Sequence, residues 1–439
     1  MAVEVICLAD DNQSMAGQAP QQAVQQMAPP SAPPEAKTTA APGAPSKLPK
    51  IEFWTGVRIA AFGIIILWTL VNIALFWANG VTPRGLIWAF WWPTFFMVQF
   101  TVFTTPWRAV KAKEMVRMFL IGMGIVFFAV YFAELAMVAA ITAFPEINPI
   151  RLFLGLDFVL GSYDPMSDVA SPVVEEVFKV LPVIIYLLVA GHGYWKRALG
   201  PLDVALLCGS VGAGFHVMEN IARVTNSYMG TLGWDRSVRP ASFGIDPFFL
   251  FPDMYHGSVS VWPGHAETAM LIGLFLGFGL MLRKKLPYVW AILPALAMVW
   301  MIWLHLLINY LRPGSPQFWA KLVMAMNLNG GLVQYVLILG LLLAIGVSMA
   351  TKFLFLQVDR KATLKVVGTE ALEYVKAHRN EPLLILKKLW SLRHFWAYRH
   401  ALAYGVFYAN QQKPEEREEW LPWLYDLRQM ALGKPEEEA

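Results

Sequence analysis

Eight long apolar runs between residues 51 and 356 constrain this chain more than any other feature of its sequence. Each run is close to or longer than the roughly 20 residues that a helix needs to cross a hydrocarbon core about 30 Å thick. Lipid offers no partner for backbone N–H and C=O groups, and the short alternating segments of a membrane barrel are absent, so the runs are read as helices. We therefore predict eight transmembrane helices, over 57–79, 86–105, 118–143, 172–195, 202–224, 263–282, 288–311 and 330–356.

The composition excludes an ordinary soluble domain. Of the 439 residues, 57% are hydrophobic and 15% are charged, whereas a soluble domain is about 45–50% apolar and about 25% charged. A formal net charge of +4 leaves no electrostatic footprint for nucleic acid, so no nucleic-acid partner is expected. The two cysteines, Cys7 and Cys208, lie in a tail and an apolar run, which argues against a disulfide framework. The predicted fold class is an all-α polytopic membrane protein embedded in a lipid bilayer.

Lysine and arginine placement predicts the orientation of these helices. The third connection, 144–171, is acidic on balance, and the fifth, 225–262, is long and rich in Trp, Phe, Pro and Asp. Both are predicted to lie outside the cell, with both termini cytoplasmic and the protein in the plasma membrane. Basic residues gather instead in the even connections and beside both ends of the membrane region: Lys47, Lys50, Arg58, Arg108, Lys111, Lys113, Arg117, Lys196, Arg197, Arg283, Lys284, Lys285, Lys352, Arg360 and Lys361.

The two flanking regions differ from the apolar core of the chain. The first is rich in Pro, Ala, Gln and Ser, cannot bury a core, lacks the features of a signal peptide, and is predicted to be disordered. In the last region charge rises, and helical apolar spacing over Leu364–Val375, Leu383–Tyr408 and Trp420–Leu432 predicts two or three amphipathic cytoplasmic helices. These helices fit either an anionic lipid surface or a small regulatory domain. The predicted domains are 1–50, 51–356 and 357–439.

Ionisable residues within the predicted helices indicate function. A charged group at mid-bilayer costs roughly 2.5–3.5 kcal/mol on insertion scales, so such groups usually face a polar interior. The fourth predicted helix carries Glu175, Glu176 and Lys179, whose spacings of four and three residues place them on one face. Adjacent carboxylates in a low dielectric resist joint ionisation, which suits a general base that can become an acid. A solvated first helical turn is the alternative interpretation.

Three further predicted helices carry polar side chains in apolar surroundings. Singly, each could be hydrogen-bonding glue between helices or an interfacial cap. Successive helices run in opposite directions, however, and these residues alternate between helix ends and helix starts, so all are predicted at one depth near the outer face. They are Glu219 and Asn220 in the fifth helix, His265 in the sixth, and His305 and Asn309, four residues apart, in the seventh.

Carboxylates and imidazoles at one depth can activate water, either directly or through a bound metal. Neither a Ser/His/Asp arrangement nor a His-Glu-x-x-His helix is recognisable. The residues alone therefore indicate a hydrolytic or proton- and ion-handling membrane site. An ion-coupled transporter and a non-catalytic membrane receptor are the alternatives, although no inverted repeat of broken helices is evident.

Four short motifs lie on successive predicted helices: Glu175-Glu176-x-x-Lys179, Phe215-x-x-x-Glu219-Asn220, Gly264-His265 and His305-x-x-x-Asn309. Together they resemble the motifs of the PrsW family of intramembrane proteases, which is related to the CPBP group with its CAAX endopeptidases. The resemblance covers about residues 110–350. In many CAAX-type relatives the second motif ends in His, whereas Glu219 stands there in this chain, which favours the PrsW branch.

The resemblance implies an intramembrane endopeptidase that cleaves a membrane-anchored regulatory protein, such as an anti-sigma factor, on the extracytoplasmic side. It implies that Glu175 activates water and that Glu176 orients it or shares its proton, with Lys179 and Asn220 in supporting positions.

The remaining motif residues are implied as metal or oxyanion ligands. Glu219, His265 and His305 would bind a divalent metal such as zinc or stabilise the oxyanion, and Asn309 would position His305 or the scissile carbonyl. The family is classed with metalloproteases, while CAAX relatives have been argued to use glutamate without a metal.

Overall fold

The computed structural model places helices over most of the predicted membrane region. The predicted tail at 1–50 lies outside the described residues, as does most of the predicted helix at 57–79. The structure describes residues 63, 66–67, 70–71, 74, 83–144, 169–189, 198–225, 255–256, 261–262, 264–310, 332–355, 377, 382–409, 411–412 and 424.

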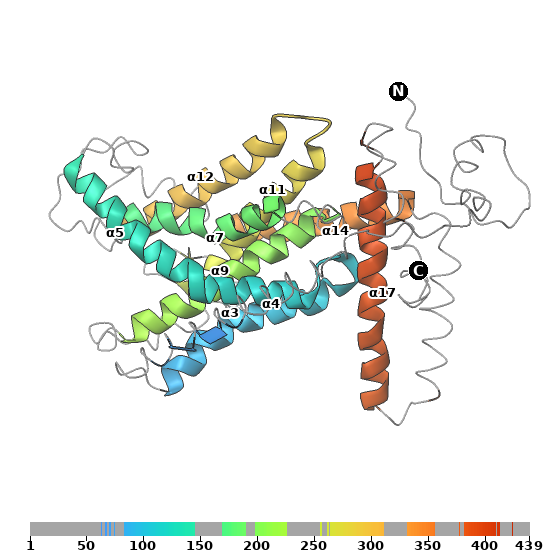
Figure 1. The fold of residues 1–439 in the computed structure, drawn as a ribbon, viewed down its shortest axis with the longest axis horizontal. Helices are drawn as coiled ribbons and strands as arrows, with labels where there is room; N and C mark the ends of the chain where they lie inside the picture. The colour runs from blue at the N-terminus through green and yellow to red at the C-terminus, as the bar shows by residue number, and fades with distance from the viewer. Residues whose placement is uncertain are drawn as a thin grey trace, which may run out of the picture. The chain divides into compact units, whose positions relative to one another are not determined.

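Seven of the predicted spans fall on helices of the structure (Figure 1). Among the described residues the fold is helical apart from a two-residue antiparallel pair, in which β1 (Tyr255–His256) faces β2 (Val261–Trp262). A short 3₁₀ turn, η1, covers Thr105–Trp107. The helices are α3 (Pro83–Phe103), α4 (Ala112–Ile121), the π-helical turn η2 (Gly122–Val126), α5 (Phe127–Ala143), α7 (Ser171–Val189), α9 (Pro201–Thr225), α11 (His265–Leu282), α12 (Val289–Tyr310), α14 (Leu332–Phe355) and α17 (Pro382–Ala409).

Four helical stretches in the described part of the chain are long and apolar enough to cross a membrane. The all-α membrane character is thereby confirmed, while the number of eight spans and the orientation of the termini stay predictions. Helix α7 falls outside this set by composition because it contains three charged residues, which the site uses. The four stretches are Ala112–Ala143, Pro201–Ala222, His265–Leu282 and Leu332–Lys352.

The α4–η2–α5 helix begins six residues before the predicted start at 118. Its first turn is polar, but the Arg117 guanidinium donates to Glu114 Oε1 at 2.8 Å, a pairing three residues apart that suits a helix. The apolar run therefore marks the membrane-facing part of this helix rather than its whole length.

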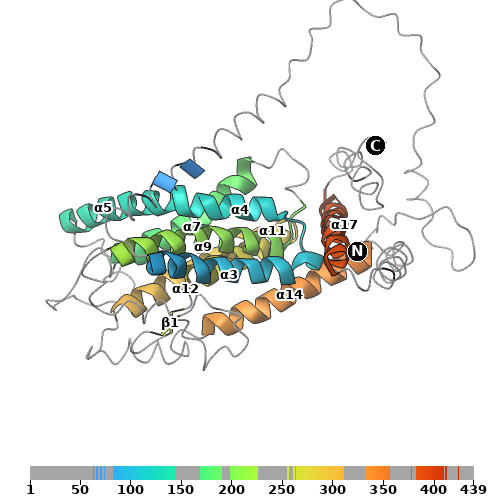
Figure 2. The same ribbon diagram turned by 90° about the horizontal axis from the view of Figure 1, so that it is seen from below.

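Helix α9 is the central helix of the bundle. Every residue from Pro201 to Ile221 is buried, and α3, α4, α7 and α11 pack around it (Figures 1 and 2). Helices α5, α7 and α14 have exposed apolar side chains instead, with Phe132, Leu188 and Leu339 exposing 67%, 72% and 66% of their surfaces. Such a surface suits lipid, whereas Glu175, Glu176 and Lys179 of α7 are buried inside the bundle.

Two glycines let α9 approach its neighbours closely. A Cβ at Gly212 would collide with the backbone carbonyl of His265, and a Cβ at Gly214 would collide with the carbonyl of Phe119. Small residues at helix crossings allow backbones to meet without a side chain between them. The first of these crossings brings the end of α9 against the start of α11.

Asp203 anchors the opposite end of α9. Its Oδ1 accepts the backbone N–H groups of Ala109 and Val110 at 2.7 and 2.8 Å, and its Oδ2 accepts that of Gly200 at 2.8 Å. A fully buried carboxylate is stable here because three backbone donors satisfy it. This contact fixes the segment before α4 against the N-terminus of α9.

Helix α17 belongs to a separate unit of the chain from the bundle. Its bounds agree with the amphipathic helix predicted over Leu383–Tyr408. The predicted helix at Leu364–Val375 lies outside the described residues, and of that at Trp420–Leu432 only Leu424 is described.

Candidate active site

Lys179 is the centre of a buried polar cluster on α7. Its ammonium donates to Glu176 Oε1 at 2.7 Å and lies 3.9 Å from Glu175 Oε2. Helical spacing brings the three together, as predicted from their positions three and four apart. The Lys179 and Glu176 side chains are fully buried. A buried lysine normally requires a partner of opposite charge, so this ion pair is an integral part of the interior.

His265 connects α7 to α9. The Lys179 ammonium lies 2.8 Å from His265 Nδ1, and His265 Nε2 lies 2.6 Å from Glu219 Oε2. An ammonium group can only donate, so Nδ1 accepts and the ring proton sits on Nε2, facing the Glu219 carboxylate; this tautomer is inferred from the hydrogen-bond pattern. The imidazole thus contacts the Lys179 cation of α7 with one nitrogen and the Glu219 carboxylate of α9 with the other.

The position of His265 depends on Gly264. Gly264 has φ 79° and ψ 159°, a conformation open to glycine and strained for other residues. The chain turns there from the segment after β2 directly into α11, which makes His265 the first helical residue. In the Gly264-His265 pair, the glycine therefore supplies the backbone conformation and the histidine supplies the imidazole of the site.

His305 reaches the cluster from α12. Its Nδ1 lies 3.1 Å from Glu176 Oε1, the oxygen that Lys179 also contacts. Asn309 lies one helical turn beyond His305 and is half-buried, and Asn220 follows Glu219 on α9 and is buried. The structure thus brings together six of the predicted site residues from four helices: Glu175, Glu176, Lys179, Glu219, His265 and His305.

The two adjacent carboxylates have different surroundings. Glu176 is held by Lys179 and His305 through close contacts. Among the described residues Glu175 makes only longer contacts, 3.9 Å to Lys179 and 3.4 Å from Oε2 to His265 Nδ1. Two carboxylates in unlike environments can take unlike chemical roles, and Glu175 is the one whose oxygens are less committed.

Two residues near the cluster were not among the predicted site residues. His216 lies one turn before Glu219 on α9, and its ring centroid is 4.9 Å from that of His265. In the sequence, His216 could be noticed only as a second ionisable residue three positions before Glu219. That spacing indicates a shared site only once it is known which side of α9 packs against α11. Glu134 of α5 is buried, and α5 packs against α7, which carries Glu175 and Glu176. In the sequence, Glu134 could be noticed only as a single acidic residue within the apolar run 118–143.

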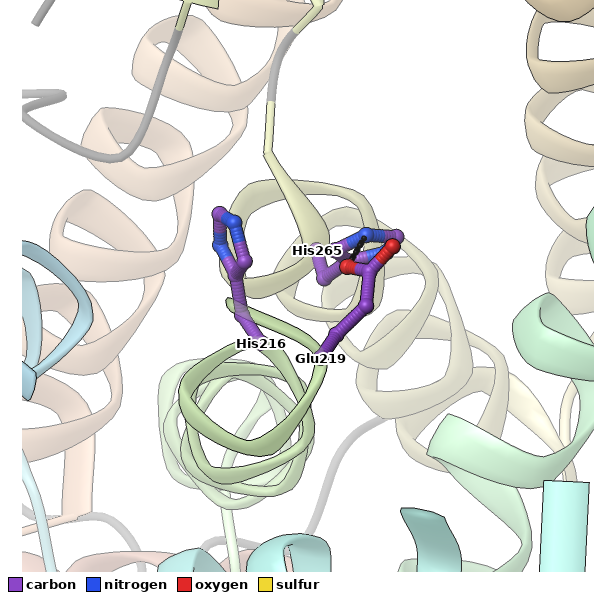
Figure 3. Close-up of side chains that lie close together, drawn as sticks. All are labelled: His216, Glu219 and His265. Carbon is purple, nitrogen blue, oxygen red and sulfur yellow. Dashed lines mark ion pairs between the residues drawn. The ribbon is translucent and has the colours of Figure 1, made fainter. Parts of the chain in front are cut away.

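Two groups of residues in the described part of the chain could hold a metal ion. One is His216, Glu219 and His265, and the other is Glu175, Glu176 and His265. The predicted ligand set of Glu219, His265 and His305 is not one of these two groups, and His305 Nδ1 contacts Glu176. Figure 3 shows the first group, with the Glu219 carboxylate paired to the His265 ring.

A protein-family model described as "PrsW family intramembrane metalloprotease" matches residues 106–345, which is more than half of the chain. This stretch contains all of the predicted site residues. No curated protein and no solved structure matches.

Proposed function

The chain belongs to the PrsW family of intramembrane metalloproteases, and on this premise we propose that it hydrolyses a peptide bond of a membrane-anchored regulatory protein near the outer membrane face. That it is a protease, and a membrane protein, follows from the family and its apolar helices. The observation that supports this site for the reaction is the junction of acids and imidazoles from α7, α9, α11 and α12. The proposed substrate is a single-span signalling protein of the anti-sigma-factor kind.

Glu175 is the proposed base that takes a proton from the attacking water. It is buried yet makes only longer contacts within the described cluster, so its oxygens are available to a water molecule. Such a base must come within about 2.6–3.2 Å of the proton that it removes. After attack, the same carboxyl can return the proton to the leaving amine.

Glu176 is the proposed positioning residue. Its Oε1 contacts both Lys179 and His305, so the carboxylate is held in place and the lysine offsets its charge. His305 is thereby oriented by Glu176, whose Oε1 accepts the Nδ1–H of this ring. When it is protonated, the ring would also donate from Nε2 to the oxyanion that forms at the scissile carbonyl. Asn309, one turn further along α12, is proposed to support His305 or the scissile carbonyl, and Asn220 to support Glu219.

The family description also implies a divalent metal, for which zinc is proposed. Glu219 and His265 offer the carboxylate and imidazole donors that suit this ion. When bound, such an ion polarises a carbonyl oxygen and acidifies water.

The proposed arrangement in the plasma membrane has eight spans with both termini in the cytoplasm. Within it, the site lies in the outer half of the bilayer, because its residues sit near the start of α7 and α11 and near the end of α9 and α12. The proposed domains are a tail at 1–50, the protease domain at 51–356 and a cytoplasmic helical region at 357–439.

Glu175→Gln tests the proposed function. Membranes containing the wild type or this variant are compared by mass spectrometry for fragments of single-span proteins released from the membrane. We expect wild-type membranes to release such fragments and Glu175→Gln membranes to release none above the level without the protease. Glu114→Gln, which changes an acid of α4 that pairs with Arg117, serves as the matched control and should cleave normally. Equal fragment release by Glu175→Gln and wild type, at equal protein levels, would refute the assignment.

A further inference from the structure

Three donors meet where the end of α9 faces the start of α11. His216 and Glu219, one turn apart on α9, project from the same side of that helix, and the Glu219 carboxylate meets the His265 ring (Figure 3). One potential ligand atom from each residue lies within 4.8 Å of the other two. All three residues are at least nine-tenths buried, with 4%, 9% and 1% of their surfaces exposed. Nothing in the predicted roles of the four motifs uses His216.

The chemistry of these donors fits a catalytic metal. Two imidazoles and one carboxylate are a ligand set of catalytic zinc sites, which keep a fourth position open. Bonds of about 2.1 Å in a tetrahedral site place ligand atoms about 3.4 Å apart. The separation of 2.6 Å between His265 Nε2 and Glu219 Oε2 is shorter than this, and no separation in the group exceeds it by more than about 1.4 Å. Rotation of the His216 and Glu219 side chains would bring the three ligand atoms to tetrahedral spacing.

The competing group already contains a cation. Glu175, Glu176 and His265 surround the Lys179 ammonium, which lies 2.7 Å from Glu176 Oε1 and 2.8 Å from His265 Nδ1. A divalent ion among the same atoms would have to displace a buried positive charge. Lys179 therefore favours the His216 side of the His265 ring for the metal.

His305 is the alternative third ligand. Its Nδ1 contacts Glu176 at 3.1 Å, and its ring centroid lies 5.9 Å from that of His265, compared with 4.9 Å for His216. His305 thus lies on the Lys179 side of the cluster. No group of donor atoms within 4.8 Å of one another in the described part of the chain joins His305 with Glu219 and His265.

We propose that His216 is the third protein ligand, with Glu219 and His265, of a divalent transition metal, and that His305 is not a ligand. This inference rests on the proposed function, because it assigns the metal of the same hydrolytic centre. Ligation through His265 Nε2 would leave the ring proton on Nδ1, so the Lys179 ammonium, a donor 2.8 Å from Nδ1, would have to turn away from the ring. Glu175 Oε2, 3.4 Å from Nδ1, would then be the acceptor. A carboxylate that accepts this proton would orient the ligating imidazole, as carboxylates commonly do at metal sites.

The test is metal binding by the purified full-length protein in detergent micelles. Zn²⁺ content is measured after dialysis, and Co²⁺ is titrated as a spectroscopic probe of the coordination sphere. We expect one ion per chain in the wild type and in His305→Ala. His216→Ala should bind at least about 100-fold more weakly, since loss even of an outer-shell partner costs 10–100-fold. His216→Cys supplies a thiolate ligand instead, and should regain Zn²⁺ and add a sulfur-to-cobalt charge-transfer band.

The outcomes separate this inference from the proposed function. Wild-type affinity in His216→Ala, absence of the thiolate band in folded His216→Cys, or metal loss in His305→Ala with His216→Ala unaffected would each overturn the ligand assignment. A wild-type protein that binds neither ion would overturn it too, while loss of cleavage in Glu175→Gln would still support the protease site. If His216→Ala does not fold, the result with His216→Cys decides.

Discussion

Replacement of Lys179 by Met tests whether its ammonium stabilises the folded protein by compensating the buried carboxylates of α7. The side chain is fully buried, and its Nζ contacts Glu176, His265 and, at a longer distance, Glu175. Met fills a similar volume without charge, so the change leaves the Glu176 carboxylate with His305 as its remaining close partner. Removing one member of a buried ion pair costs about 3–5 kcal/mol, because the other charge stays buried and uncompensated.

The double variant Lys179→Met/Glu176→Gln supplies the sharper measurement. With both charges gone, the penalty of an unpaired carboxylate disappears, so the double variant should be more stable than Lys179→Met alone. A coupling of about 2 kcal/mol or more between the two changes is expected, at the upper end of what residues in direct contact show. Lys113→Met, at an exposed position of α4, is the matched control and should change stability by no more than about 0.5 kcal/mol.

Cys208 offers the assay. Its thiol is fully buried in α9, so its modification by a fluorogenic maleimide reports opening of the bundle. In a Cys7→Ser background, the free energy of unfolding is read from labelling rates across an SDS titration. Additive effects of the two changes, within about 0.5 kcal/mol, would refute the pairing of Lys179 with Glu176 as a source of stability.

Three further outcomes are expected. Asp203→Ala leaves three backbone N–H groups without their acceptor, at about 1–3 kcal/mol for each buried donor, and Asp203→Asn should cost less; Cys208 labelling measures both, and equal stability of Asp203→Ala and wild type would contradict the anchor. Gly264→Ala should cost about 1–3 kcal/mol and lower cleavage more than stability alone explains, because the strained turn positions His265; unchanged cleavage would show that the turn is not needed. Zn²⁺ at about 100 times its dissociation constant should stabilise the folded wild type by about 2.7 kcal/mol, and chelation should abolish this gain.

The sequence indicates which residues belong to this site better than it indicates which of them contact one another. Intramembrane acids and imidazoles stand out against apolar runs, and alternating helix direction suffices to predict that Glu175, Glu219, His265 and His305 lie at one end of the bundle. The contacts depend on which face of each helix turns inward, and α9 is apolar enough all round that its sequence does not mark one face. His216 and Glu134 therefore needed the packing of α9 against α11 and of α5 against α7 before they could be connected to the site.

The central position of α9 was open to prediction only in part. The stretch Gly212-Ala213-Gly214 predicts a close helix contact, but two different neighbours use it: His265 of α11 faces Gly212, and Phe119 of α4 faces Gly214. A sequence pattern gives the capacity for close approach without naming the partner. Likewise, the anchor at Asp203 joins residues almost a hundred positions apart, and no local pattern indicates that pairing.

Charge balance links the lysine to the proposed metal. If Glu175, Glu176 and Glu219 are all ionised, Lys179 offsets one of three negative charges, and two remain in a region shielded from water. Uncompensated charges of this kind are costly in a low dielectric, whereas a divalent ion beside Glu219 would neutralise the remainder. His265 lies between the two positions, with Nδ1 toward the ammonium and Nε2 toward Glu219. If an ion binds beside Glu219, the ring would separate it from the Lys179 ammonium, which pairs with Glu176. Glu175, within reach of the ring yet less tightly held than Glu176, would be left to act on water.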